Sequence, residues 1–278
     1  MKGEASIRLK LPFLLTGKGE CGIIQIMIII KSKKEIECIR RSGRLLGDTF
    51  EYVKDLIVPG LTTQKLDKEI ETFITEKGAK PAFKGYGGFP ASACISINEV
   101  VIHGIPDERI LKSGDIVGVD IGVLYNGCFS DSAYTFGVEN ISKEAERLMR
   151  TTQKALYRAI DKARAGNRVG DISHIVEQTA ESEGYNVVRE FVGHGVGRQL
   201  HEEPPVPNFG REGIGPRLKE GMTLAIEPMI NIGTYEVRVL DDGWTVVTRD
   251  NELSAHYEHT ILITDNEAEI LTSFSLYE

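Results

Sequence analysis

Apolar residues recur every three or four positions across residues 32–57, a spacing that places them along one face of an α-helix. Pro59-Gly60 ends this pattern. A second helical pattern begins at a capping threonine, Thr62 or Thr63, and ends at Gly78. The apolar face of this second predicted helix consists of Leu66, Ile70, Phe73 and Ile74.

Three apolar runs follow a glycine-rich loop, and they predict β-strands. They span residues 93–98, 100–105 and 115–125. Asn126-Gly127 lies between the last run and another apolar segment, which is a strong signal for a two-residue hairpin turn. The sequence therefore predicts a β-hairpin centred on this dipeptide.

The sequence repeats itself at an offset of 106 or 107 residues. Residues 111–120 match residues 218–227, and the two predicted helices match a second pair of helical segments. The matching helix positions are Gly60, Leu66, Ile70 and Gly78 with Gly166, Ile172, Val176 and Gly184. A duplicated helix–helix–strand unit of this length predicts one α+β domain built from two similar halves.

Composition narrows the class of protein. The chain has 278 residues, of which 41% are hydrophobic and 27% are charged, as in an ordinary globular protein. A net charge of −8 argues against non-specific binding to nucleic acid or to anionic membranes. No apolar run is long enough to span a bilayer.

Residues 1–26 lack a clean signal peptide, so we predict an N-terminal extension, either loose or a mis-assigned start, before a single domain of residues 27–278.

The four cysteines carry neither a metal-binding nor a disulfide signature. They are Cys21, Cys38, Cys94 and Cys128. No two of them have the CxxC spacing of a zinc knuckle or of a thioredoxin-like redox site. Because four cysteines do not make a disulfide framework in a chain of this size, we expect a reducing, cytoplasmic environment.

Acidic residues end both of the repeated strands. Asp120 and Glu227 each follow a mainly apolar run, where a charge is costly unless it is paired or bound to a cation. In the predicted hairpin Asp120 faces Ala133 and Asp131 faces Gly122, so the two aspartates share one face as diagonal neighbours. Two carboxylates this close repel each other unless one is protonated or a cation lies between them. The pattern therefore points to a cation site.

Two further candidate ligands lie in the second half of the chain. His194 is flanked by glycines, and Glu258 lies in another apolar run. Two aspartates, two glutamates and one histidine suit Mn²⁺, Fe²⁺, Co²⁺ or Zn²⁺ better than they suit a thiolate-bound metal. Four carboxylates are more than one such ion needs, so we expect two ions, which together can activate water and polarise a carbonyl.

The residues alone leave other interpretations open. Asp131 and Glu258 are each compatible with a capping or ion-paired surface acid, and His103 and His201 with structural histidines. The glycines of residues 193–197 resemble a phosphate-binding loop, but the Lys-Ser/Thr pair that such a loop requires does not follow them.

Six segments together resemble the bacterial type I methionine aminopeptidases. They include FKGYGGFPASACISINEVVIHGIP, VGVDIGVLYNGCFSDSAYTF, GHGVGRQLHEEPPVPNFG and SAHYEHTILIT, and they correspond to residues 83–106, 117–136, 193–210, 224–229, 241–251 and 254–264. The similarity runs from about Met27 to the C-terminus. It implies the pita-bread fold, an α+β architecture in which two helix pairs flank a curved antiparallel sheet with internal pseudo-twofold symmetry.

The resemblance also implies a set of ligands for two divalent ions. Asp131 and Glu258 are similar to the carboxylates that bridge the ions. Asp120 resembles a ligand of one ion, and His194 and Glu227 resemble ligands of the other. The identity of the metal, among Co²⁺, Mn²⁺, Fe²⁺ and Zn²⁺, does not follow from the sequence.

Three residues resemble the catalytic groups of the family. His103 is similar to the histidine that contacts the nitrogen of the scissile bond. His201 is similar to the histidine that contacts the scissile carbonyl oxygen or the oxyanion that forms from it. Glu227 is expected to move the proton between water and the leaving amine.

Two further sets of residues follow from the resemblance. The expected methionine pocket consists of Tyr86, Phe89, Cys94, Leu200 and Trp244. The expected site for a monovalent cation consists of Asn98, Val100 and Ser254. Aromatic rings suit a thioether side chain, because sulfur packs well against ring edges.

The implied activity is removal of the initiator methionine from nascent proteins and peptides whose second residue is small and uncharged. The expected protein is a cytoplasmic monomer without nucleic-acid or membrane partners, and ribosome docking stays open. Two alternatives are a binding module that does not hydrolyse peptides and a peptidase for X-Pro bonds. The steps of 33 residues from His194 to Glu227 and 31 residues from there to Glu258 exclude the long insertion of the type II class.

Overall fold

The computed structural model describes residues 28–275. Its helices are α1 (Lys33–Val53), α2 (Thr63–Glu76), α3 (Lys143–Lys162) and α4 (Val169–Ser182), with short 3₁₀ turns η1 (Lys54–Leu56) and η2 (Tyr86–Gly88). Its strands are β1 (Lys80–Pro81), β2 (Cys94–Ile97), β3 (Val100–Ile102), β4 (Ile116–Tyr125), β5 (Cys128–Gly137), β6 (Asn186–Val187), β7 (Gly193–Gly195), β8 (Glu202–Val206), β9 (Thr223–Ile226), β10 (Met229–Asn231), β11 (Val237–Val239), β12 (Val246–Thr248), β13 (Ser254–His256), β14 (Glu258–Leu262) and β15 (Glu269–Ile270). The predicted N-terminal extension, residues 1–26, lies outside the described residues.

The first helix pair forms where the apolar pattern predicts it. Ser32 caps α1 in a capping box with Glu35, so that the side chain of each residue accepts a hydrogen bond from the backbone N–H of the other. Thr62 is the cap of α2, which settles the choice between the two threonines. Phe73 is an exception to the predicted face of α2. Its ring is only half-buried and stacks on Tyr52, with 4.7 Å between the ring centroids.

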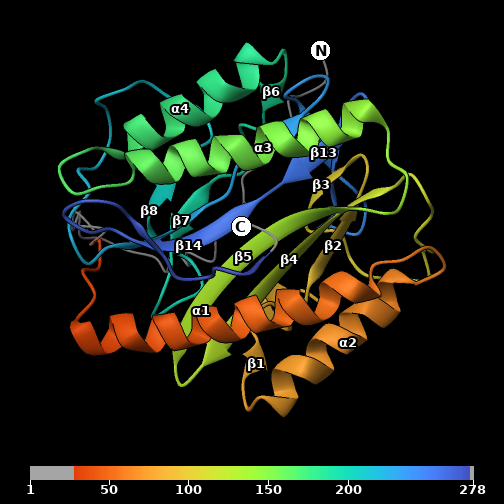
Figure 1. The fold of residues 1–278 in the computed structure, drawn as a ribbon, viewed down its shortest axis with the longest axis horizontal. Helices are drawn as coiled ribbons and strands as arrows, with labels where there is room; N and C mark the ends of the chain where they lie inside the picture. The colour runs from red at the N-terminus through yellow and green to blue at the C-terminus, as the bar shows by residue number, and fades with distance from the viewer. Residues whose placement is uncertain (1–27, 276–278) are drawn as a thin grey trace, which may run out of the picture.

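The central sheet is antiparallel, and its strands follow the order β1-β4-β5-β14-β9-β7-β8. β2 pairs with β4, and β15 pairs with β14. Figure 1 shows α1 and α2 on one side of the view and α3 and α4 on the other, with the strands between them. This arrangement confirms the predicted α+β fold.

Each helix pair packs against its own half of the sheet. Alternate residues of β4, Val117, Val119 and Ile121, join the core beneath α1 and α2. In the other half, Leu224 and Ile226 of β9 join the core beneath α3 and α4. Because side chains alternate between the faces of a strand, the residues between these apolar positions point to the opposite face of the sheet.

The predicted duplication is visible in the backbone. α1 and α2 have 21 and 14 residues, and α3 and α4 have 20 and 14. Gly78 and Gly184 follow the second helix of each pair at matching positions, with φ angles of 76° and 81°. Positive φ at the end of a helix favours glycine, because a side chain would be strained there. The repeated glycines therefore mark the same chain reversal in both halves.

The cysteine prediction was wrong for one pair. A disulfide joins Cys38 of α1 to Cys128 at the start of β5. The two residues are 90 positions apart in the chain. They meet because α1 crosses over the hairpin of β4 and β5, and no sequence spacing records that contact. Within residues 28–275 no helix is both long and apolar enough to cross a bilayer.

Candidate metal centre

Five neighbouring strands each deliver one of the predicted ligands. Across the sheet, β4 carries Asp120, β5 carries Asp131, β14 carries Glu258, Glu227 directly follows β9, and β7 carries His194. These side chains line one pocket. The sheet order therefore brings together residues from both halves of the duplicated chain.

The register of the hairpin places the first two aspartates as predicted. Asn126 and Gly127 have φ angles of 51° and 83°, as a type I′ turn requires. Asp120 pairs with Ala133, and Asp131 pairs with Gly122. This confirms the predicted register of the hairpin and the diagonal relation of the two carboxylates.

The other strands continue the same row of side chains. Glu258 pairs with Ala133 from the far side of β5, so Ala133 lies between Asp120 and Glu258. Its small side chain leaves space above the strand, where the longer acidic side chains meet. On β9 and β7, Ala225 pairs with His194 in the same way.

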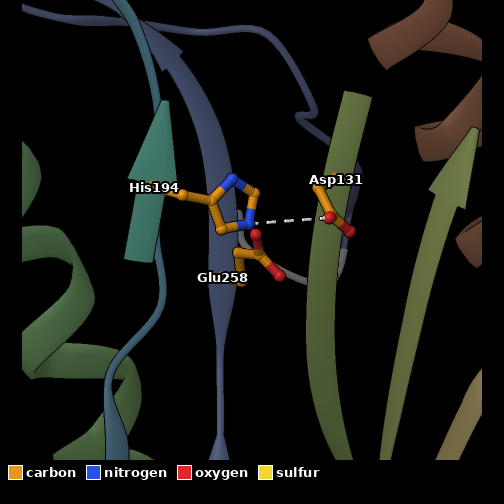
Figure 2. A group of neighbouring side chains, drawn as sticks. All are labelled: Asp131, His194 and Glu258. Carbon is orange, nitrogen blue, oxygen red and sulfur yellow. Dashed lines mark ion pairs between the residues drawn. The ribbon is translucent and has the colours of Figure 1, made fainter. Parts of the chain in front are cut away.

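The side chains converge on one centre. Figure 2 shows Asp131, His194 and Glu258 pointing toward one another, and each offers a ligand atom within 4.8 Å of the others. Nε2 of His194 lies 3.9 Å from Oδ2 of Asp131 and 3.5 Å from Oε1 of Glu227. Nδ1 of His194 is 2.9 Å from the carbonyl oxygen of Gly195. An Nδ1–H that donates to this carbonyl leaves the lone pair of Nε2 directed at the carboxylates.

The cluster carries more negative charge than its own partners neutralise. Burial raises the pKa of Asp120 to about 7. Burial, together with neighbouring carboxylates, raises the pKa of Asp131, Glu227 and Glu258 well above the ordinary range. Oδ1 of Asp120, Oδ1 of Asp131 and Oε1 of Glu258 are buried without a hydrogen-bond partner among the described residues. Unpartnered carboxylate oxygens next to a neutral imidazole fit divalent cations, which would supply the missing positive charge.

The pocket beside the carboxylates encloses about 150 Å³. This is smaller than a cleft for a drug-sized ligand, which holds roughly 300–1,000 Å³, and suits a single side chain. Its other walls are mainly apolar and aromatic. They consist of Phe83, Tyr86, Phe89, Cys94, His103, Leu200, His201 and Trp244.

The two predicted catalytic histidines lie at different walls of this pocket. The ring of His201 lies 4.2 Å from the ring of His194, and its Nδ1 is 2.9 Å from the hydroxyl oxygen of Tyr86. The ring of His103 meets the rings of Phe191 and Trp244 in edge-to-face arrangements, with centroid distances of 5.7 and 6.4 Å. Both histidines therefore line the same pocket as the carboxylates.

The family model for metallopeptidase family M24 matches residues 37–265. This chain belongs to that family. The M24 chain is 56% identical to the methionine aminopeptidase of Clostridium perfringens over 88% of its own length and 99% of the relative's. It is 49% identical to methionine aminopeptidase 1 of Bacillus subtilis over the same shares of the two chains. The crystal structure of the methionine aminopeptidase from Thermotoga maritima superimposes with a TM-score of 0.87 at 46% identity, covering 89% of this chain and 100% of that one.

The M24 chain has two site residues that the sequence analysis did not single out. Phe83 lines the pocket next to Phe89 and is buried with it. His256 is buried behind the carboxylates, with Nε2 3.7 Å from Oε2 of Glu227. The sequence position of each residue was a weak indication of its role. Phe83 begins the glycine-rich segment, and His256 lies two residues before the predicted ligand Glu258.

The residues predicted to hold a monovalent cation lie away from this pocket. The backbone N–H of Ser254 donates to the carbonyl oxygen of Asn98 over 2.9 Å, and Val100 lies in the neighbouring strand β3. The side-chain oxygen of Asn98 accepts from the N–H of Ile116. The cation site stays a prediction.

Proposed function

We propose that this M24 peptidase removes the N-terminal methionine from proteins and peptides whose second residue is small and uncharged. The observation that carries the proposal is the position of the five predicted ligand side chains in the lining of one small pocket whose other walls are mainly apolar and aromatic. Such a pocket accommodates one side chain and places the adjacent peptide bond next to the ligands. We propose further that residues 27–278 act as one catalytic domain, as a monomer in the cytoplasm.

The five side chains have the chemistry to hold two divalent ions, Co²⁺, Mn²⁺, Fe²⁺ or Zn²⁺. Asp131 and Glu258 occupy the middle strands, so they are the proposed bridging ligands, with Asp120 on one side and His194 and Glu227 on the other. When bound, such ions make water acidic enough to act near neutral pH and polarise a carbonyl group.

The protein's own groups then bind substrate and move protons. Glu227 is the proposed proton carrier, taking a proton from the attacking water and delivering it to the leaving nitrogen. Burial lowers the pKa of His103 to about 4, so this histidine is neutral and can contact the leaving nitrogen. The Tyr86 hydroxyl, by donating to Nδ1 of His201, would leave the Nε2–H of His201 to donate to the carbonyl oxygen as it gains charge.

The pocket supplies the preference for methionine. Phe89 and Trp244 meet edge to face with 5.2 Å between their centroids, next to buried Cys94 and Leu200. The thioether sulfur of methionine packs favourably against aromatic edges, and a charged side chain would lose its hydration without gaining a partner there.

The proposal is tested with metal-free protein and the peptides Met-Ala-Ser and Lys-Ala-Ser. Addition of Mn²⁺ or Co²⁺ is expected to restore release of methionine from the first peptide and to leave the second intact. The peptide Ala-Pro serves as the control for an X-Pro peptidase. If no divalent ion restores methionine release, the proposed function is wrong, and two bound ions without turnover would point to a binding module.

His201→Ala is expected to lower kcat by roughly 100- to 1,000-fold, the range for loss of one donor to a developing oxyanion. KM for Met-Ala-Ser should change much less, because the interaction strengthens only as the carbonyl oxygen gains charge. Steady-state kinetics on metal-loaded protein measures both constants. A rise in KM with unchanged kcat would assign His201 to ground-state binding instead.

A further inference from the structure

The segment that carries His201 is short and lies between two strands of the sheet. We name residues 196–201, which connect β7 to β8, the His201 loop. Leu200 of this loop lines the pocket, and His201 follows it. A loop that holds two site residues needs a fixed backbone, because small displacements of a catalytic group reduce the rate strongly.

The carboxylate of Glu202 binds the backbone of the His201 loop. Its Oε1 accepts from the N–H groups of Arg198 and Gln199, at 2.6 and 3.0 Å. These two contacts hold the start of the loop against the first residue of β8, so that the chain closes a tight turn. Leu200 and His201 are the residues enclosed by that turn.

The second oxygen of this carboxylate is paired with a distant cation. Nζ of Lys31 lies 2.5 Å from Oε2 of Glu202, and the two residues are 171 positions apart. The side chains are only 1% and 2% exposed. The backbone N–H of Lys31 donates to the carbonyl oxygen of Gly221 over 2.8 Å, which holds the lysine against the chain that precedes β9.

The packing around this ion pair is tight. A Cβ atom added at Gly197 would lie 2.7 Å from Cε of Lys31 and 2.9 Å from Cδ1 of Ile39. Outside the ion pair, Arg198 bonds to Glu35 at 2.5 Å, and Glu35 is the residue that closes the capping box of α1. One ionic contact therefore joins the start of α1 to the His201 loop, and a second joins Lys31, just before α1, to Glu202, just after the loop.

Burial of an ion pair is weak evidence for a contribution to stability, because the desolvation of both charges offsets their attraction. We assign this ion pair a role in positioning. Lys31 holds the carboxylate of Glu202 in place, and Glu202 in turn holds the backbone N–H groups of Arg198 and Gln199 in the loop.

We propose that Lys31 and Glu202 are positioning residues that hold the His201 loop so that the imidazole of His201 faces the scissile carbonyl. This inference rests on the proposed function, since it assigns His201 to the same reaction. It adds that residues 28–32, which directly precede α1, take part in the alignment of the active site, although none of them lines the pocket.

Glu202→Gln tests the proposal, because the amide keeps the shape of the side chain and loses its charge. We expect kcat for Met-Ala-Ser to fall about 10- to 100-fold, the range for a slightly misplaced catalytic group, with little change in KM. In a His201→Ala background the same substitution should lower kcat by less than about twofold, since the group through which it acts is already absent. Equal losses in both backgrounds would overturn the proposal.

Glu269→Gln is the matched control. It removes the carboxylate partner of Arg40, a residue of α1, from an ion pair that is partly exposed and lies outside the pocket lining, so kcat should stay within about twofold of wild type. Elemental analysis should find the metal content of Glu202→Gln equal to that of wild type. Loss of metal in the variant would overturn the assignment to His201, because it would place the effect on the ligands.

A readout that does not depend on turnover separates this inference from the proposed function. The imidazole resonances of His201, identified by their absence in His201→Ala, should shift in Glu202→Gln. An unchanged resonance overturns the positioning role, whereas an inactive wild-type enzyme speaks only against the proposed function. If Glu202→Gln does not fold, Lys31→Met combined with Glu202→Gln removes both buried charges and is subject to the same criteria.

Discussion

Asp131→Asn is expected to reduce methionine release by a factor on the order of 1,000 or more while the protein stays folded. Asp131 lies on the strand between Asp120 and Glu258, and its carboxylate also faces His194 at 3.9 Å. A neutral amide in this position cannot serve two cations. Bound ions stabilise the transition state by several kcal/mol, and each ~1.4 kcal/mol corresponds to a factor of ten in rate.

The same variant should not be unstable without metal. Burial and the neighbouring carboxylates raise the pKa of Asp131, so the metal-free protein already favours a neutral group at this position, and a neutral amide of the same shape replaces it without a charge penalty. Kinetics with saturating Mn²⁺ and thermal unfolding in the presence of a chelator measure the two effects. Asp48→Asn, on the exposed side of α1, is the matched control and should leave both unchanged. Turnover close to that of wild type in Asp131→Asn would show that the residue is not a bridging ligand.

Removal of metal is expected to abolish activity and to make the stability of the protein depend on pH. Burial raises the pKa of Asp120 from its ordinary value of 3.8 to about 7 in the absence of a cation. The folded metal-free protein therefore holds this proton at pH values where the unfolded chain has lost it. Its contribution to the free energy of unfolding is highest below about pH 4, falls as the pH rises through about 7, and is constant above that.

Divalent ions should reverse this loss, because they bind the deprotonated carboxylates and displace the protons. His194 does not alter the expectation, since burial lowers its pKa to about 3 and leaves it neutral across this range. The gain in melting temperature on addition of Mn²⁺ should therefore be larger at pH 8 than at pH 5.5. Calorimetry of the metal-free and the loaded protein at both values measures it.

Asp120→Asn provides the comparison that isolates this carboxylate. Without metal, the variant should be more stable than wild type at pH 8, and the difference should diminish toward pH 5. The titration of histidines in the unfolded chain is common to both proteins and cancels. If the addition of Mn²⁺ raises the melting temperature of wild type by the same amount at pH 5.5 and at pH 8, the proposed carboxylate site is contradicted.

Local physics made a large part of this molecule predictable from its residues. The spacing of apolar residues, three or four positions apart, predicted the first helix pair, and the capping residues indicated where its helices begin. Asn126-Gly127 determined a hairpin whose register followed by counting, so the diagonal relation of Asp120 and Asp131 was predictable from the residues alone. The internal repeat indicated a second helix pair and a second acid-terminated strand, because repeated sequences satisfy the same packing in the same way.

Contacts between distant segments were decided by the tertiary structure. In the order β4-β5-β14-β9-β7, the strand that carries Glu258, β14, lies between β5 and β9. β5 is more than a hundred positions earlier in the chain, whereas β9 is much closer in sequence. No local pattern specifies that order. Phe83 in the pocket wall and the Cys38–Cys128 disulfide likewise depend on which loop or helix passes over which strand.

The sequence by itself thus determined which segments are helices and strands, which face of each strand is apolar, and which residues have the chemistry of metal ligands. Only the tertiary structure decided that five of those residues line one pocket and that Lys31 reaches Glu202. The reason is physical: hydrogen-bonding periods and turn geometry act over a few residues, whereas the choice of neighbouring strands depends on the burial of whole apolar faces, to which residues far apart in the chain contribute together.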